Sequence, residues 1–126
     1  MSAAFTVLVV DDNLDIAGVL ADILEVKGYS VLAANSGAEA LLFLREHPVD
    51  ILLTDVRMPQ MNGLELYQEA HKNYPNLVTI FMTAYAADDL IQQGMAEGVK
   101  TVLTKPLDMK FMLLLLSAQR RTMTNG

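Results

Sequence analysis

The chain contains no cysteine, which excludes a disulfide framework, a thiolate metal site and a cysteine nucleophile. Long apolar runs are absent as well. The longest, residues 111–116, covers less than two helical turns, whereas a membrane span needs roughly 20 residues. The first residues lack the basic stretch and apolar run of a secretory signal. We therefore expect a cytoplasmic protein that does not span or bind a membrane.

Positive charge is scarce in this sequence. The chain has 9 Lys and Arg against 15 Asp and Glu, a formal net charge of −6, and no basic patch stands out. Attraction to a phosphate backbone would need such a patch. We therefore expect no direct binding of nucleic acid.

The length predicts a single compact domain over residues 1–126. A hydrophobic fraction of 52% is enough to bury a sizeable core, and no linker or repeat interrupts the chain. Residues 122–126 are typical of a frayed tail or a cut linker. The possibility of a covalently linked output domain is therefore left open.

Five apolar segments rich in β-branched residues predict strands. The first and third of these segments are continuously apolar and do not alternate with polar residues. Such a pattern is typical of central parallel strands covered by helices on both faces. The five strands are expected at residues 5–10, 29–33, 49–54, 77–82 and 101–103.

Amphipathic segments between these strands predict helices. Apolar residues repeat with helical spacing from residue 16 until Gly28 supplies a stop. Ser36 and Glu39 have the spacing of a capping box and open a second helix over residues 38–47. The later helices are expected after Asn62 with Glu65, over residues 87–97, and after Pro106 with Asp108 as the cap.

The regular alternation of strands and helices predicts an α/β fold. Right-handed crossovers make the strands parallel and place helices on both faces, as in a doubly wound (βα)5 sheet. In such sheets ligands bind at the carboxyl ends of the strands. Function should therefore be sought at that edge.

Three carboxylates are expected at this edge. Asp11 and Asp12 follow the first strand directly, and Asp55 follows the third. Like charges at close range destabilise a site unless a cation compensates, and hard oxygen ligands suit Mg²⁺. Each acid taken alone could equally cap the following helix.

A cation and a hydroxyl are expected beside these acids. Lys105 follows the fifth strand, and Thr83 ends the fourth. An ammonium and a metal ion would both be needed to neutralise the oxygens of a phosphoryl group on Asp55. The alternatives are a solvated lysine and an ordinary threonine at a strand end.

Together these motifs resemble the receiver domain of two-component response regulators, the CheY-like superfamily. The resemblance rests on Asp11-Asp12, Asp55, Thr83-Ala84 and Lys105-Pro106 in that order, and on the stretch over residues 55–63. It covers the chain from Val7 to about Ala118. It implies a flavodoxin-like sheet with the strand order 2-1-3-4-5.

The resemblance also implies roles for individual residues. Asp55 would accept a phosphoryl group from a histidine kinase or a histidine phosphotransfer protein. Asp12, Asp55 and the Arg57 carbonyl would bind Mg²⁺, with Asp11 holding the metal through water. Lys105 and Thr83 would bind the phosphoryl group. The chain would not be an enzyme beyond its own phosphorylation and dephosphorylation, and a bacterial phosphorelay is the expected setting.

One position departs from the family pattern. The family usually has Tyr or Phe three residues before the lysine, where this chain has Val102. The conformational change on phosphorylation must then be relayed without burial of a large aromatic ring at that position. Tyr85 and Arg57 occupy positions that influence acyl-phosphate lifetime in the family, although an ordinary exposed tyrosine is an equal alternative.

The fifth helix carries two apolar stripes, and only one can face the sheet. The second is expected to form a contact surface, with helix 4 and strand 5, for a homodimer or an output domain; the alternative is a deeply covered helix. The first stripe comprises Met109, Met112, Leu113 and Leu116, and the second Phe111, Leu114, Leu115 and Ala118.

Two functions other than that of a phosphoacceptor are alternatives. A small-molecule phosphatase with an aspartate nucleophile would need a substrate-binding cap, which this length does not provide. A degenerate receiver that serves only as an interaction module would be expected to lose the acceptor, the other acids or the lysine. Only Val102 favours the degenerate receiver.

Overall fold

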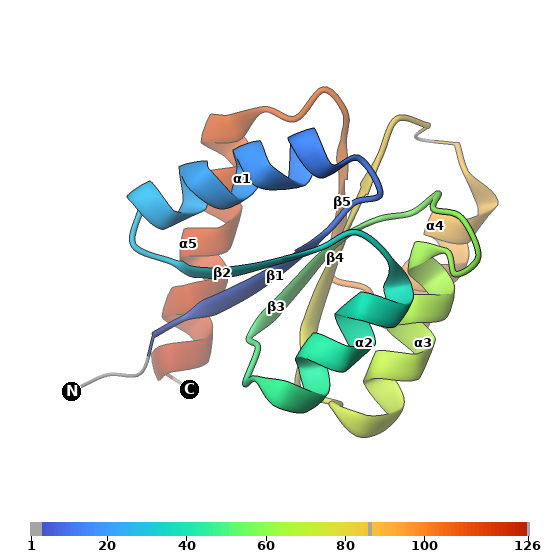
Figure 1. The fold of residues 1–126 in the computed structure, drawn as a ribbon, viewed down its shortest axis with the longest axis horizontal. Coiled ribbons are helices and arrows are strands. Elements are labelled where there is room, and N and C mark those ends of the chain that lie inside the picture. Colours follow the sequence, from blue (N-terminus) through green and yellow to red (C-terminus); the bar gives the residue numbers. More distant parts are fainter. Residues whose placement is uncertain (1–3, 86, 126) are drawn as a thin grey trace.

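A computed structural model describes residues 4–85 and 87–125 of the chain. Five strands alternate with five helices (Figure 1). The elements are β1 (Thr6–Val10), α1 (Leu14–Val26), β2 (Ser30–Ala34), α2 (Gly37–Glu46), β3 (Ile51–Asp55), α3 (Gly63–Asn73), β4 (Val78–Thr83), α4 (Asp89–Glu97), β5 (Thr101–Thr104) and α5 (Met109–Asn125).

All five strands are parallel and lie in the order β2-β1-β3-β4-β5. The predicted α/β fold and strand order are confirmed. The central strands β1 and β3 are fully buried, as their unbroken apolar sequences require. The carboxyl ends of all five strands therefore meet at one edge of the sheet.

The helices cover the two faces of the sheet unequally. Helices α1 and α5 pack on one face, where Leu20, Leu24, Met112 and Leu116 are buried against the sheet. Helices α2, α3 and α4 cover the other face, as Figure 1 shows. None of the helices in the described residues is long and apolar enough to span a membrane.

The helix caps differ in detail from the predictions. The Asn62–Glu65 capping box is complete. The Ser36 hydroxyl caps α2, but the Glu39 carboxylate accepts from the amide of Asn35 at 2.8 Å rather than from that of Ser36. Helix α5 starts after Asp108, whose carboxylate accepts from the Phe111 amide as expected. It continues to Asn125, so residues 122–125, expected to be a tail, are helical.

Candidate functional site

The three predicted acids come together at the carboxyl edge of the sheet. Asp11 and Asp12 directly follow β1, and Asp55 is the last residue of β3. Each offers a carboxylate oxygen, and these oxygens lie within 4.8 Å of one another. The structure therefore gathers three negative groups in one small volume.

Lys105 lies among these acids and is not a solvated lysine. Its Nζ donates to Asp11 Oδ2 at 2.8 Å and lies 3.3 Å from Asp55 Oδ2. Burial alone would lower the pKa of Lys105, but the hydrogen bond to Asp11 and the charges of both acids together raise it. The ammonium therefore stays charged and partly neutralises the site.

Asp11 is buried beside this ammonium, whereas Asp12 is exposed. Asp11 Oδ1 also accepts from the amide of Asn13 at 2.9 Å. The cap of α1 is Asn13, whose side chain accepts from two amides in the first turn. The alternative that Asp11 or Asp12 caps this helix is therefore wrong, and the sequence interpretation missed Asn13.

The acceptor candidate, Asp55, is nearly buried. Its Oδ1 accepts from the Val56 amide at 2.9 Å, and its Oδ2 faces Lys105. Burial raises the pKa of Asp55 and the Asp11 charge adds to this, while Lys105 acts in the opposite direction. A carboxylate in this position gains stability from any additional cation.

The composition of the site fits a hard divalent cation. Three carboxylates face a single ammonium, so negative charge remains in excess. The donors are oxygens only, and Asp12 is open to solvent, which suits Mg²⁺ because this ion keeps several of its waters. The acidic cluster is therefore able to hold a metal ion.

Thr83 ends β4 as predicted and is buried. Its hydroxyl is engaged by its own loop, accepting from the Tyr85 amide at 3.0 Å and donating to the Tyr85 carbonyl at 3.3 Å. The Thr83 carbonyl accepts from the Lys105 amide at 2.7 Å, which joins the two strand ends. The hydroxyl must release the Tyr85 carbonyl before it can donate to another group.

Tyr85 and Val102, the two positions discussed for signalling, differ in exposure. The Tyr85 residue is 70% exposed, as the alternative of an ordinary surface tyrosine requires. Val102 is partly buried against a cluster of α3, β4 and α4 that includes Phe81 and Ile91. A valine thus fills the place at which the family usually has a ring.

A feature missed from the sequence is a two-pronged ion pair between Arg57 and Asp88. Arg57 Nε and Nη2 donate to the two oxygens of Asp88 at 2.6 and 2.7 Å. Asp88 is also the cap of α4. No pattern links two residues 31 positions apart, so only the fold could reveal this pair.

Gly63 was also missed, although it stands in the motif after Asp55. A Cβ at this position would lie 2.5 Å from the Asp55 carbonyl oxygen and 3.0 Å from Val56 Cα. The Gly63 amide donates to the Val56 carbonyl at 2.8 Å. The first residue of α3 therefore packs directly on the backbone of Asp55 and Val56.

The two stripes of α5 are divided differently from the prediction. Met112 and Leu116 are fully buried, while Phe111 and Leu114 are 55% and 62% exposed. Leu115 was expected on the exposed stripe but is partly buried and packs against the core, because its side chain points back toward the sheet. The exposed apolar surface is therefore smaller than predicted.

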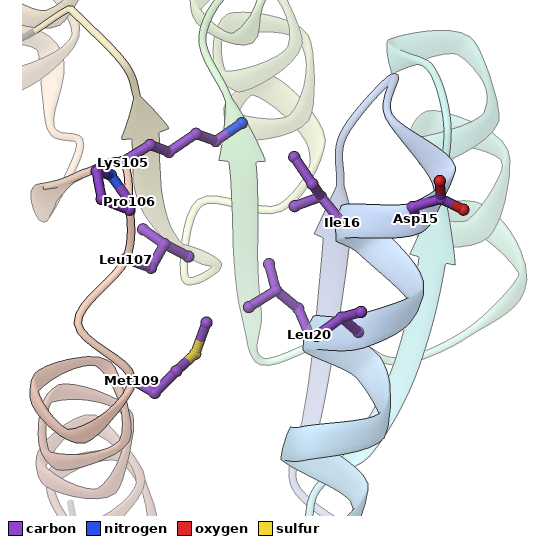
Figure 2. Close-up of a pocket in the computed structure, with 8 residues that line it drawn as sticks. Asp15, Ile16, Leu20, Lys105, Pro106, Leu107 and Met109 are labelled. Atoms are coloured by element: carbon purple, nitrogen blue, oxygen red, sulfur yellow. The ribbon is translucent and has the colours of Figure 1, made fainter.

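An apolar groove of about 360 Å³ lies beside the acidic site, between α1 and the connection from β5 to α5. Ile16 and Leu20 line one side and Leu107 and Met109 the other, as Figure 2 shows. In this view the side chain of Lys105, which also lines the groove, extends from the end of β5 toward the end of β3.

This fold and this cluster of acids around a lysine define a receiver of the two-component kind. Residues 7–117 match the family model for the response regulator receiver domain. The chain therefore belongs to that family.

Individual relatives support the same family. The chain is 44% identical over 100 residues to a response regulator receiver protein of Anaeromyxobacter, covering 79% of this chain and 42% of that protein. It resembles a signal receiver domain of Pseudomonas fluorescens, with a TM-score of 0.92 and 27% identity over 98% of this chain and 100% of that chain. A chain of the CheX–CheY–BeF3–Mg²⁺ complex of Borrelia burgdorferi is 28% identical, with a TM-score of 0.83, over 90% of this chain and 87% of that one.

Two of the curated relatives are much longer than the region matched. The chain spans 42% of the Anaeromyxobacter protein and 25% of the ZraR regulator of Klebsiella oxytoca.

Proposed function

We propose that Asp55 accepts a phosphoryl group and that the chain acts as the switch of a two-component phosphorelay. The observation that carries this proposal is the contact of Lys105 with both Asp55 and Asp11, at the edge where Asp12 is open to solvent. This arrangement leaves a reactive carboxylate next to a cation and an acidic metal site.

Asp12, Asp55 and the Arg57 carbonyl are proposed to bind Mg²⁺ directly, with Asp11 acting through water. The choice of Asp12 over Asp11 is supported by exposure, because Asp12 is open to solvent whereas Asp11 is buried between Lys105 and the Asn13 amide. When bound, Mg²⁺ neutralises the phosphoryl oxygens.

The proposed reaction uses Asp55 as the nucleophile. One of its oxygens attacks the phosphorus of a phosphohistidine, the phosphorus–nitrogen bond breaks, and the imidazole leaves with that electron pair. The product is an acyl phosphate. Water later attacks its phosphorus and releases inorganic phosphate and the free carboxylate. No other turnover is proposed for this chain.

Lys105 and Thr83 are proposed to bind the transferred group. Lys105 Nζ already lies 3.3 Å from Asp55 Oδ2. Thr83 can donate to the group only if its hydroxyl releases the Tyr85 carbonyl. This exchange of partners is the proposed first movement of the switch.

The proposed donor is a cytoplasmic histidine kinase or a histidine phosphotransfer protein. A homodimer or a linked output domain is proposed to use the surface formed by α4, β5 and α5, where Phe111 and Leu114 are exposed. The Borrelia burgdorferi relative, solved with CheX, BeF3 and Mg²⁺, supports both a protein partner and the metal.

Beryllofluoride, which mimics a phosphoryl group on a carboxylate, tests this proposal. Amide resonances around Asp55, Thr83 and Lys105 should shift when Mg²⁺ and beryllofluoride are both present, and less with Mg²⁺ alone. Asp55→Asn should remove the additional shifts. An unchanged spectrum of the parent chain would contradict the proposal.

A further inference from the structure

The ion pair between Arg57 and Asp88 joins the two loops that border the site. Arg57 stands two residues after Asp55, and Asp88 caps α4. The pair is bidentate, with two short hydrogen bonds between charged groups, which is among the strongest side-chain contacts in proteins. It therefore fixes the start of α4 relative to the acceptor loop.

The two partners differ in exposure. The Asp88 side chain is 3% exposed and that of Arg57 is 61% exposed. Besides the two Arg57 donors, the Asp88 carboxylate accepts from the Leu90 amide at 3.0 Å. A buried carboxylate depends on its donors, so Asp88 is held in place mainly by Arg57.

The loop between β4 and α4 also binds the Thr83 hydroxyl, through an acceptor that Thr83 shares with Asp88. The Tyr85 carbonyl accepts from the Thr83 hydroxyl at 3.3 Å and from the Asp88 amide at 3.2 Å. The hydroxyl at the site and the cap of α4 are thus tied to one peptide group. A Thr83 hydroxyl that moves to a phosphoryl group gives up one of these bonds.

We propose that Asp88 is a positioning residue whose pair with Arg57 holds the loop in the conformation that keeps Thr83 on Tyr85, and thereby opposes the phosphorylated state. This inference rests on the proposed function. A contact present in only one of two conformations shifts the equilibrium by its own strength. The pair should therefore limit the affinity for a phosphoryl mimic.

The test is a beryllofluoride titration at saturating Mg²⁺, followed by amide peak intensities in the intact chain. Asp88→Ser keeps a residue that caps helices well but is too short to reach Arg57. Arg57→Met keeps the cap and the length of the side chain but removes both donors. Each variant should bind beryllofluoride about fivefold more tightly, or better, than the parent.

The matched control is Asp89→Asn, which removes a neighbouring exposed charge from the first turn of α4 and should leave the affinity within about twofold, the size of a screened surface effect. Folding of every variant is checked by its amide spectrum. If the parent binds and either folded variant binds no more tightly, the inference is overturned while the proposed function stands. If the parent does not bind, both are overturned.

Discussion

Asp11 and Asp12 are adjacent acids with different surroundings. The structure engages both oxygens of Asp11 and leaves Asp12 exposed. We therefore predict that Asp12→Ala weakens Mg²⁺ binding more than Asp11→Ala, because only the first change removes a carboxylate proposed to bind the metal directly. Calorimetric titration of each variant with Mg²⁺ measures the difference. Equal affinities would contradict this division of roles.

Gly63 is predicted to be intolerant of even one added carbon. The new Cβ of Gly63→Ala would overlap the Asp55 carbonyl oxygen, so the start of α3 must shift, at a cost of about 1–3 kcal/mol in the free energy of unfolding. Urea denaturation measures this cost.

The control for this change is Gly18→Ala in α1, where nothing lies within 4 Å of the added carbon. The free energy of unfolding of that variant should be about 0.5–1 kcal/mol higher than that of the parent. A Gly63→Ala variant as stable as the parent would show that the close packing on the acceptor backbone is not needed.

At the level of residues, the sequence predicts the groups that end strands and misses those that depend on loops. The predicted strand ends, together with the parallel arrangement expected of an α/β fold, place Asp55, Thr83 and Lys105 at one edge. The pairing of Arg57 with Asp88 depends on the path of two loops, and loop paths have no periodic pattern.

Among the elements, helix α5 carries the clearest test. Phosphorylation is predicted to strengthen an association made by Phe111 and Leu114. Sedimentation with and without beryllofluoride should show the association, and Leu114→Glu should weaken it about tenfold or more, the effect of roughly 1.4 kcal/mol. Burying either apolar side chain would supply about 1.5–3 kcal/mol.

The control is Val26→Glu, at an exposed apolar residue that ends α1. It should associate like the parent. Leu115→Glu is unsuitable because Leu115 packs against the core. If Leu114→Glu associates as strongly as the parent in both states, α5 is not the contact surface.

The elements themselves were predicted well because each carries its own signal. Strand bounds differ from the predictions by no more than two residues. The larger error lies in α5, where the chain continues as helix to Asn125. The polar composition of that last turn resembles a tail, but Met123 within it packs against the core, which a compositional argument cannot anticipate.

For the whole molecule, the pattern of five strands and five helices limits the topology strongly. Right-handed crossovers leave few arrangements for a parallel sheet, and the resemblance to receivers selected the order that the structure has. The division of α5 into buried and exposed sides needed the packed fold. Leu115 turns toward the core only because α5 lies where it does on the sheet.

The central claim is that Asp55 is phosphorylated with the help of Mg²⁺, and mass spectrometry after incubation with acetyl phosphate tests it most directly. The parent chain should gain the mass of one phosphoryl group with Mg²⁺ and none after the metal is chelated, because the acceptor needs its charge neutralised. The Asp55→Ala variant should gain none in either case. Equal labelling of the parent and this variant, or no labelling of the parent with Mg²⁺, would contradict the account, and the second result would favour a receiver that serves only as an interaction module.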